Sequence, residues 1–150
     1  MLKLITLFDN NTPYFDEIEA LFLTNDVKKF FPCYDRLIDK ISACHGHFFV
    51  VTYDSEFIGA LYLDKWGDDS CYLSGFSKRK NPHTVKAVKL LVKTTFEDYP
   101  FIKKIYAEIQ KENKPAQLAI RRAGFKLTEK EILFKIERFY HCVRERRTNN

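Results

Sequence analysis

The hydrophobic period changes after His47, and the runs that follow predict three consecutive β-strands in the middle of the chain. Residues 48–53 and 57–63 are two strand-like runs, and the short polar link at residues 54–56 is typical of a hairpin turn. Residues 67–69, Gly-Asp-Asp, turn the chain again before a third run at residues 70–76. The pattern therefore predicts three antiparallel strands.

The segment before these strands predicts one strand and two helices. Residues 2–8 form a strand-like run, and Thr12-Pro13, followed by two acids, is typical of a capped helix start. The apolar face of that first helix would hold Phe15, Ile18, Leu21 and Phe22. A second helix is expected from Pro32 to Ala43, with Leu37, Ile38 and Ile41 facing inward.

Helical periodicity returns after Asn81-Pro82 and ends at Tyr99-Pro100. The apolar face of this helix would hold Val85, Val88, Leu91, Val92 and Phe96, and its outward face Lys86, Lys89 and Lys93. A strand at residues 104–109, a short helix from Pro115 and a last strand containing Ile132, Phe134 and Ile136 follow. Residues after about 140 are expected to form a basic C-terminal tail.

Residues 113–125, Asn-Lys-Pro-Ala-Gln-Leu-Ala-Ile-Arg-Arg-Ala-Gly-Phe, carry the most informative motif. Pro115 suits the first turn of a helix, and Gly124 suits the position just past its end. With the strand before it and the strand after it, this arrangement resembles the GNAT-type N-acetyltransferase superfamily. In that family the Asn lies where the sheet splays open beside acetyl-coenzyme A.

The order of predicted elements is similar to that of the GNAT fold up to about Tyr140. The resemblance implies a single α/β (α+β) domain over residues 1–150. Its sheet would be mixed, mostly antiparallel and splayed near its centre, with about four flanking helices.

The resemblance also implies a site for acetyl-coenzyme A at the end of the third central strand. In the family that strand offers backbone groups to the pantetheine arm, and the next loop and helix start hold the pyrophosphate, because a helix N-terminus favours negative charge. The corresponding cofactor-binding residues here are Gly75, Phe76, Ser77, Lys78, Arg79, Lys80 and Asn113.

The phosphate loop departs from the family pattern. Family members usually carry glycines there, whereas residues 77–84 contain none, and Pro82 has no N–H to donate. Either Lys78, Arg79 and Lys80 bind phosphate through their side chains, or the pocket is degenerate.

More than one group could serve as the general acid or as the general base. Ile120 stands where many family enzymes have a tyrosine that protonates the leaving thiolate, and isoleucine has no proton to give. Water or a tyrosine such as Tyr106 or Tyr140 could serve as the acid. Glu108 and Ser74 are candidates for the base, although ordinary positions in a sheet explain both equally well.

Composition narrows the class of protein. The chain has 150 residues, 45% hydrophobic and 15% aromatic, which suits one globular domain with a packed core. No apolar stretch reaches the roughly 20 residues that span a bilayer, and the N-terminus does not continue as a signal peptide, so a cytoplasmic protein is expected. Trp66 and the tyrosines could line a groove, but the strands of a half-buried sheet explain most of them.

Cysteine spacing favours reduced thiols and no metal. Cys33, Cys44, Cys71 and Cys142 lie far apart, which favours free thiols over disulfides in a chain of this kind. The neighbouring residues of Cys44-His45-Gly46-His47 are poorly spaced for zinc, so a polar start to the next strand is the preferred interpretation.

The formal charge of +5 favours anionic partners, which could be the phosphates of a cofactor or nucleic acid. A nucleic-acid partner is not favoured, because lysines on an outward helix face usually serve solvation and Glu145 interrupts the arginines near the C-terminus.

Two functions remain. The first is an N-acetyltransferase that moves an acetyl group from acetyl-coenzyme A to a primary amine, of a small molecule or a protein, in a ternary complex. The alternative is a GNAT-fold protein without catalysis that acts by binding a protein partner or as part of an assembly. The glycine-free Lys-Arg-Lys loop also resembles phage GNAT-like proteins, several of them virion-associated.

Overall fold

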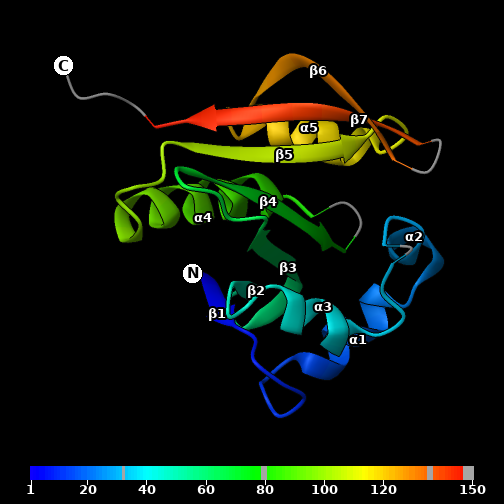
Figure 1. Ribbon diagram of the computed structural model, residues 1–150. Coiled ribbons are helices and arrows are strands. Elements are labelled where there is room, and N and C mark those ends of the chain that lie inside the picture. The colour runs from blue at the N-terminus through cyan, green and yellow to red at the C-terminus, as the bar shows by residue number, and fades with distance from the viewer. Residues whose placement is uncertain (32, 79–80, 135–136, 147–150) are drawn as a thin grey trace.

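Seven strands form one mixed sheet in the order β1-β2-β3-β4-β5-β7-β6 (Figure 1). The computed structural model describes residues 1–31, 33–78, 81–134 and 137–146, and the side chains of these residues outside 129–140. The strands are β1 (Leu2–Thr6), β2 (Phe48–Tyr53), β3 (Glu56–Asp64), β4 (Ser70–Ser77), β5 (Lys104–Gln110), β6 (Lys126–Phe134) and β7 (Glu137–Glu145). The helices are α1 (Phe15–Phe22), α2 (Asn25–Lys28), α3 (Leu37–Ala43), α4 (Thr84–Asp98) and α5 (Lys114–Arg122).

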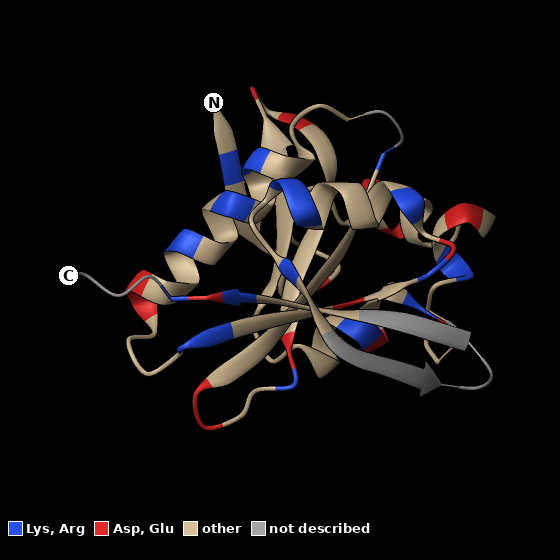
Figure 2. Ribbon diagram, turned by 90° about the horizontal axis from the view of Figure 1, so that it is seen from above, with Lys and Arg blue, Asp and Glu red and all other residues tan. Residues whose placement is uncertain are grey.

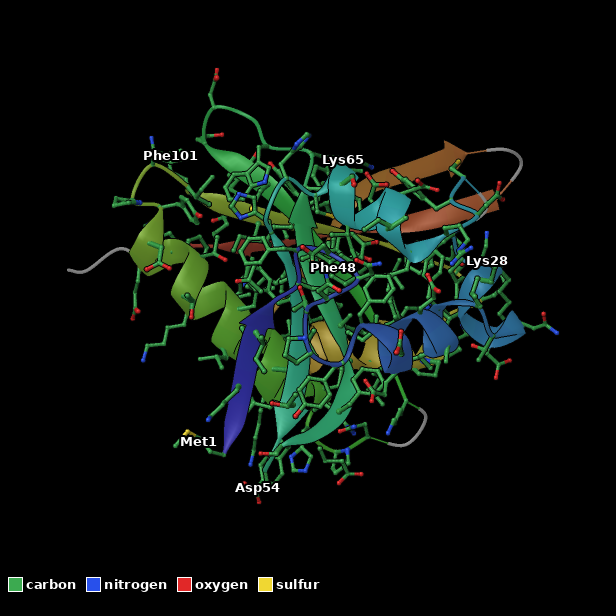
Figure 3. All side chains as sticks on the ribbon, turned by 90° about the horizontal axis from the view of Figure 1, so that it is seen from below. Met1, Lys28, Phe48, Asp54, Lys65 and Phe101 are labelled. Atoms are coloured by element: carbon green, nitrogen blue, oxygen red, sulfur yellow. The ribbon has the colours of Figure 1, made fainter. Side chains whose placement is uncertain are left out.

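The two faces of the sheet bury separate apolar clusters. Successive residues of a strand point to opposite faces, so Val50 packs with α1 and α3 while its neighbour Val51 packs with α4. Phe48 is fully buried under α1 and α3, near the centre of Figure 3. The second cluster lies beneath α4 and α5 and includes Leu91 and Ile120.

The predicted strands of the central meander are confirmed. β2 and β3 pair antiparallel, and β3 and β4 do the same. Asp54 and Ser55 take left-handed backbone angles, with φ of 50° and 66°, which suit the tight turn between β2 and β3. The N-terminal ammonium of Met1 contacts the Asp54 carboxylate, and both residues lie at the same end of the sheet in Figure 3.

The long amphipathic helix is confirmed as α4. Val88, Leu91 and Val92 are buried. The predicted lysines of the outward face, Lys86, Lys89 and Lys93, are exposed, and Figure 2 shows basic positions recurring along this helix.

The N-terminal helices differ from the prediction. Thr12 does not cap α1: its hydroxyl oxygen accepts hydrogen bonds from the N–H groups of Phe8 and Asp9, each at 3.2 Å, so it stabilises a turn before the helix. The second predicted helix is shorter than expected, because the extended backbone of Arg36 delays its start to Leu37, while Pro32 lies outside the described residues. Ile38 is 37% exposed, against the prediction that it faces inward.

The short helix α2, between α1 and α3, was not predicted from the sequence. With α2 the described chain has five helices, in line with the expectation of about four.

The C-terminal region also corrects the prediction. The single last strand is a hairpin of β6 and β7, and β7 lies between β5 and β6, so residues 141–145 are strand and not tail. The guanidinium of Arg146 donates hydrogen bonds to the carbonyls of Ile102, Phe96 and Tyr99 at 2.9, 2.8 and 3.2 Å. Arg146 thus closes the C-terminal end of α4 instead of fraying into solvent.

Residues of the predicted last strand and C-terminal tail fall wholly or partly outside the described part of the chain. Ile136 and Arg147 lie outside the described residues, and so do the side chains of Ile132 and Phe134.

Candidate functional site

The sheet opens between its two neighbouring parallel strands. β4 and β5 pair at residues 70–72 and 104–106. Beyond this point β4 stays with β3 as far as Ser77, while β5 stays with β7 as far as Gln110. The carboxyl ends of the two strands therefore diverge, which confirms the predicted splay near the centre of the sheet.

A cleft of about 1170 Å³ occupies this divergence. One part is lined by the end of β4, the start of α4 and the first turns of α5, and includes Ser77, Thr84 and Ala116. A second part runs toward α2 and α3 and includes Phe30 and Lys40. A cleft of this size, at the carboxyl ends of parallel strands, is typical of a ligand site in an open sheet.

The backbone of β4 offers polar groups to this cleft. The N–H of Lys78 donates to the carbonyl of Ile58, one residue before the Gly59–Ser77 pair of β3 and β4, at 3.0 Å. Because backbone groups alternate between the two edges of a strand, Gly75 and Ser77 direct theirs to the opposite edge, where β5 has moved away. Glycine at position 59 lets β3 approach closely, since a Cβ there would lie 2.6 Å from the Phe76 carbonyl.

Two helices begin beside the cleft, and their first turns differ. In α5 the side-chain carbonyl of Asn113 accepts a hydrogen bond from the N–H of Ala116 at 3.3 Å, and Pro115 occupies the first turn. At the other end Gly124 takes a φ of 97°, as expected for the residue that ends a helix. The sequence predicted this helix and both of its ends.

The start of α4 is more open. Its N-cap residue, His83, has no side-chain hydrogen bond to the first turn among the described residues, and that turn carries no acid. The Asn81 side chain accepts a hydrogen bond from the His83 N–H at 2.8 Å, and the His83 ring stacks on Tyr53 at 3.8 Å. These contacts fix the turn before the helix. They leave its first N–H groups available for an anion.

The structure brings five of the seven predicted cofactor residues to the cleft: Gly75, Phe76, Ser77, Lys78 and Asn113. The Phe76 ring packs against Phe31 at 5.6 Å, so its side chain belongs to the core. The Lys78 ammonium lies 5.0 Å from the centre of the Phe57 ring. Arg79 and Lys80 lie outside the described residues.

The candidate positions for the general acid and the general base differ in what surrounds them. Ile120 is 5% exposed and lines the cleft with an apolar side chain. The Glu108 carboxylate lies 3.4 Å from the Lys65 ammonium. Ser74 lines the cleft as well. The side chain of Tyr140 is outside the described part of the chain.

An ion pair lies at the α3 side of the cleft. The Lys40 ammonium is 3.0 Å from the Asp64 carboxylate and 4.2 Å from the centre of the Tyr62 ring, and Lys40 is only 5% exposed. Burial raises the pKa of Tyr62 well above its ordinary value, so its hydroxyl stays protonated.

Sequence reasoning missed a second polar cluster. The Tyr72 hydroxyl, on β4, lies 3.3 Å from Nε2 of His141 on β7, and Nδ1 of His141 lies 2.8 Å from the hydroxyl of Thr128 on β6. His141 was assigned to the tail, so nothing placed it near the cleft. The aromatic and β-branched residues along 139–143, Phe-Tyr-His-Cys-Val, are a weak signal that could have indicated a strand.

The cysteines are all free thiols, with Cys33 exposed and Cys44, Cys71 and Cys142 buried. Burial raises the pKa of Cys44 and of Cys71 to about 12, which keeps these two thiols protonated and unreactive.

The histidine region beside Cys44 is aromatic in character. His47 packs against Trp66 at 4.7 Å and Tyr99 at 5.7 Å, so Trp66 belongs to this cluster and not to the cleft. No group of three metal-ligating side chains occurs within the described residues. In the same part of the chain, no helix is both long and apolar enough to cross a membrane.

Comparison with solved structures identifies the architecture. No protein-family profile matches the chain, and no curated protein matches it in sequence. A GNAT-family acetyltransferase from Bacillus anthracis superposes with a TM-score of 0.79 at 15% identity, over 96% of this chain and 94% of the other.

Two further solved structures agree. Aminoglycoside acetyltransferase AAC(6')-Ib in complex with coenzyme A has a TM-score of 0.77 at 12% identity, over 97% of this chain and 95% of the other. Campylobacter jejuni N-acetyltransferase PseH in complex with acetyl coenzyme A has a TM-score of 0.70 at 16% identity, over 98% and 100%. At these identities the likeness establishes architecture, and the prediction from residues 113–125 is confirmed at that level: the chain has the GNAT fold.

Proposed function

We propose that this chain is an acetyl-coenzyme A-dependent N-acetyltransferase that acts on a primary amine by direct transfer in a ternary complex. The observation that carries the proposal is the divergence of β4 and β5 into a cleft with a free strand edge on one side and an open helix start on the other. Solved neighbours of the same fold contain coenzyme A or acetyl coenzyme A, which supports the same ligand here.

The residues around the cleft fit such a ligand. Backbone groups of Gly75 and Ser77 would hold the pantetheine arm, and the first turn of α4 would face the pyrophosphate. The side chains of Lys78, Arg79 and Lys80 would replace the missing glycine amides as phosphate contacts. Asn113 would fix the opposite wall, at the end of β5.

When bound, acetyl-coenzyme A supplies a thioester whose carbonyl is open to attack. A backbone N–H of β4 would polarise that carbonyl and stabilise the charge that develops on its oxygen. The α3 side of the cleft, where Lys40, Asp64 and Tyr72 lie, would hold the amine and position its nitrogen. Ile120 would exclude water. Protonation of the leaving thiolate would fall to water or to a tyrosine that lines the cleft, which Tyr106 does not.

Two observations support an amine as the acceptor: the residues that line the cleft, and the ligand of one solved neighbour. AAC(6')-Ib has been solved with coenzyme A and kanamycin, a ligand that carries amines. The second part of the cleft combines aromatic rings with charged groups of both signs, which suits a polar amine from a small molecule or a protein side chain.

The test begins with the melting temperature, with and without acetyl-coenzyme A. A ligand at about 100 times its dissociation constant adds roughly 2.7 kcal/mol to the free energy of unfolding. The double variant Arg79→Glu, Lys80→Glu should lose this stabilisation. The matched control Lys103→Glu, Lys104→Glu, whose side chains are exposed outside the cleft, should keep it.

Transfer is then measured as release of the coenzyme A thiol with kanamycin or a lysine peptide as acceptor. The glycine-free loop and Pro82 favour one alternative, a GNAT-fold protein that acts by binding another protein. Absence of acetyl-coenzyme A binding at low salt would reject the enzyme and leave this alternative.

A further inference from the structure

Tyr72 lies at the point where the two parallel strands separate. It forms the last pair between β4 and β5, opposite Tyr106, and it lines the cleft. Its hydroxyl is within hydrogen-bond distance of Nε2 of His141, at 3.3 Å. Tyr72 therefore connects the cleft to a side chain behind the sheet opening.

His141 is held in a fixed orientation. It is 6% exposed on β7, opposite Glu108 of β5. Its Nδ1 lies 2.8 Å from the Thr128 hydroxyl. In the tautomer with its proton on Nδ1, the ring donates to Thr128 and accepts the hydroxyl proton of Tyr72 through Nε2. Three strands thus form one chain of hydrogen bonds from the cleft inward.

Among the described residues, the two charged side chains nearest Tyr72 are paired with each other. Glu108 is engaged by Lys65, whose ammonium also lies 5.0 Å from the centre of the Tyr72 ring. Burial, followed by the proximity of Glu108 and Tyr106, raises the pKa of Tyr72. The Tyr72 hydroxyl therefore stays protonated near neutral pH, and it can pass on a proton only by accepting another.

A primary amine needs such a relay. Its ordinary pKa is about 10.4 when it is a lysine side chain, so at neutral pH it is protonated and cannot attack a thioester. We propose that Tyr72 and His141 form a proton relay that deprotonates the acceptor amine. The inference rests on the proposed acetyltransferase function and assigns the proton acceptor of that reaction to residues of β4 and β7.

Every proton and electron pair in the transfer reaction has a destination. One proton of the ammonium moves to the Tyr72 oxygen as the Tyr72 proton moves to Nε2 of His141, which becomes imidazolium. The amine lone pair forms the C–N bond, the C–S bond breaks, and the sulfur leaves with its electron pair. A second nitrogen proton reaches the thiolate to give the coenzyme A thiol. His141 then returns its proton to solvent through Tyr72.

The test compares Tyr72→Phe with Tyr106→Phe. Both remove one hydroxyl from the same group of rings, since the Tyr106 ring lies 5.2 Å from that of Tyr72 and 4.8 Å from that of His141. For Tyr72→Phe we expect a loss of about 100-fold in kcat/KM for kanamycin or a lysine peptide, the usual size of a general base effect. The dissociation constant of acetyl-coenzyme A, measured by calorimetry, should not change. Tyr106 is not among the residues that line the cleft, so Tyr106→Phe should keep its rate.

Two readouts separate the relay from a structural role. In the wild type the rate should fall as pH drops and the His141 ring becomes protonated, and His141→Gln should lose this dependence. Nitrogen NMR of the ligand-free protein should show the His141 Nε2 signal shifted by Tyr72→Phe and not by Tyr106→Phe.

Three results would overturn the relay. Equal rates for the two tyrosine variants in an active enzyme would overturn the relay and leave the proposed function standing. A rate that depends on Glu108→Gln, with unchanged Tyr72→Phe, would assign the base to Glu108 and overturn it as well. A wild type that neither binds acetyl-coenzyme A nor acetylates an amine would reject the proposed function, and the relay with it.

Discussion

Helices α4 and α5 both begin beside the cleft, yet only α5 closes its own first turn. Asn113 satisfies an N–H of α5 with its side chain. His83 gives no such bond to α4 among the described residues, and no acid complements the helix dipole there. The cap stabilises α5, whereas the uncapped start of α4 fits the proposal that an anion completes its first turn.

The largest expected effect comes from supplying α4 with an acid of its own. Thr84→Asp places a carboxylate in the first turn, where it should repel the phosphates of acetyl-coenzyme A. We expect the dissociation constant to rise at least about tenfold, or 1.4 kcal/mol. The melting temperature should hold or rise, because the acid complements the helix dipole.

Calorimetry with two controls checks this result. Thr84→Asn adds no charge and should bind acetyl-coenzyme A normally. Lys114→Glu places an acid at the start of α5, outside the cleft lining, and should also leave affinity intact. If Thr84→Asp and Lys114→Glu weakened acetyl-coenzyme A binding equally, the proposed difference between the two helix starts would be wrong.

A smaller effect is expected where α5 loses its cap. Asn113→Ala removes the bond to the Ala116 N–H and should lower the free energy of unfolding by about 1 kcal/mol. For a chain of this size the melting temperature should fall by about 3 °C. Asn113→Ser, which can still cap, should recover most of the loss. If Asn113→Ala melted at the same temperature as the wild type, the cap would contribute nothing to the stability of the protein.

The smallest effect should come from Lys78. Exposed ion pairs are worth about 0.2–1 kcal/mol and are screened by salt, so Lys78→Gln should weaken acetyl-coenzyme A binding only a few-fold at low salt. The difference from wild type should shrink in 0.5 M sodium chloride. A difference that persists at high salt would argue against an exposed side-chain contact and for a buried one.

Local sequence signals predicted the helices that have characteristic residues at their ends or a continuous apolar face. Pro115 and Gly124 bound α5 within a few residues, and the apolar stripe of α4 needs no tertiary information. The one-turn helix α2 has no such pattern. The divergence of β4 and β5 followed from resemblance to a family, because no local rule specifies how long two parallel strands stay paired.

Long-range contacts account for what was missed. Arg144 and Arg146 belong to a segment that looks like a solvated tail, yet Arg146 bonds three carbonyls at the end of α4 and the turn after it. His141 became a site residue only through its place beside Tyr72. Lys78 was expected at the cleft and lies there, but its ammonium rests on Phe57, a contact across the sheet that the sequence does not encode locally.

The position of β7 has a consequence for how the chain is made. β7 is made after the other six described strands, yet it lies between β5 and β6. Until it arrives, the edge of β5 has no partner along Lys104–Gln110 and the carbonyls that Arg146 binds are exposed. The nascent protein therefore carries an open sheet edge until β7 has been made, and the docking of β7 should be a slow step that is prone to aggregation.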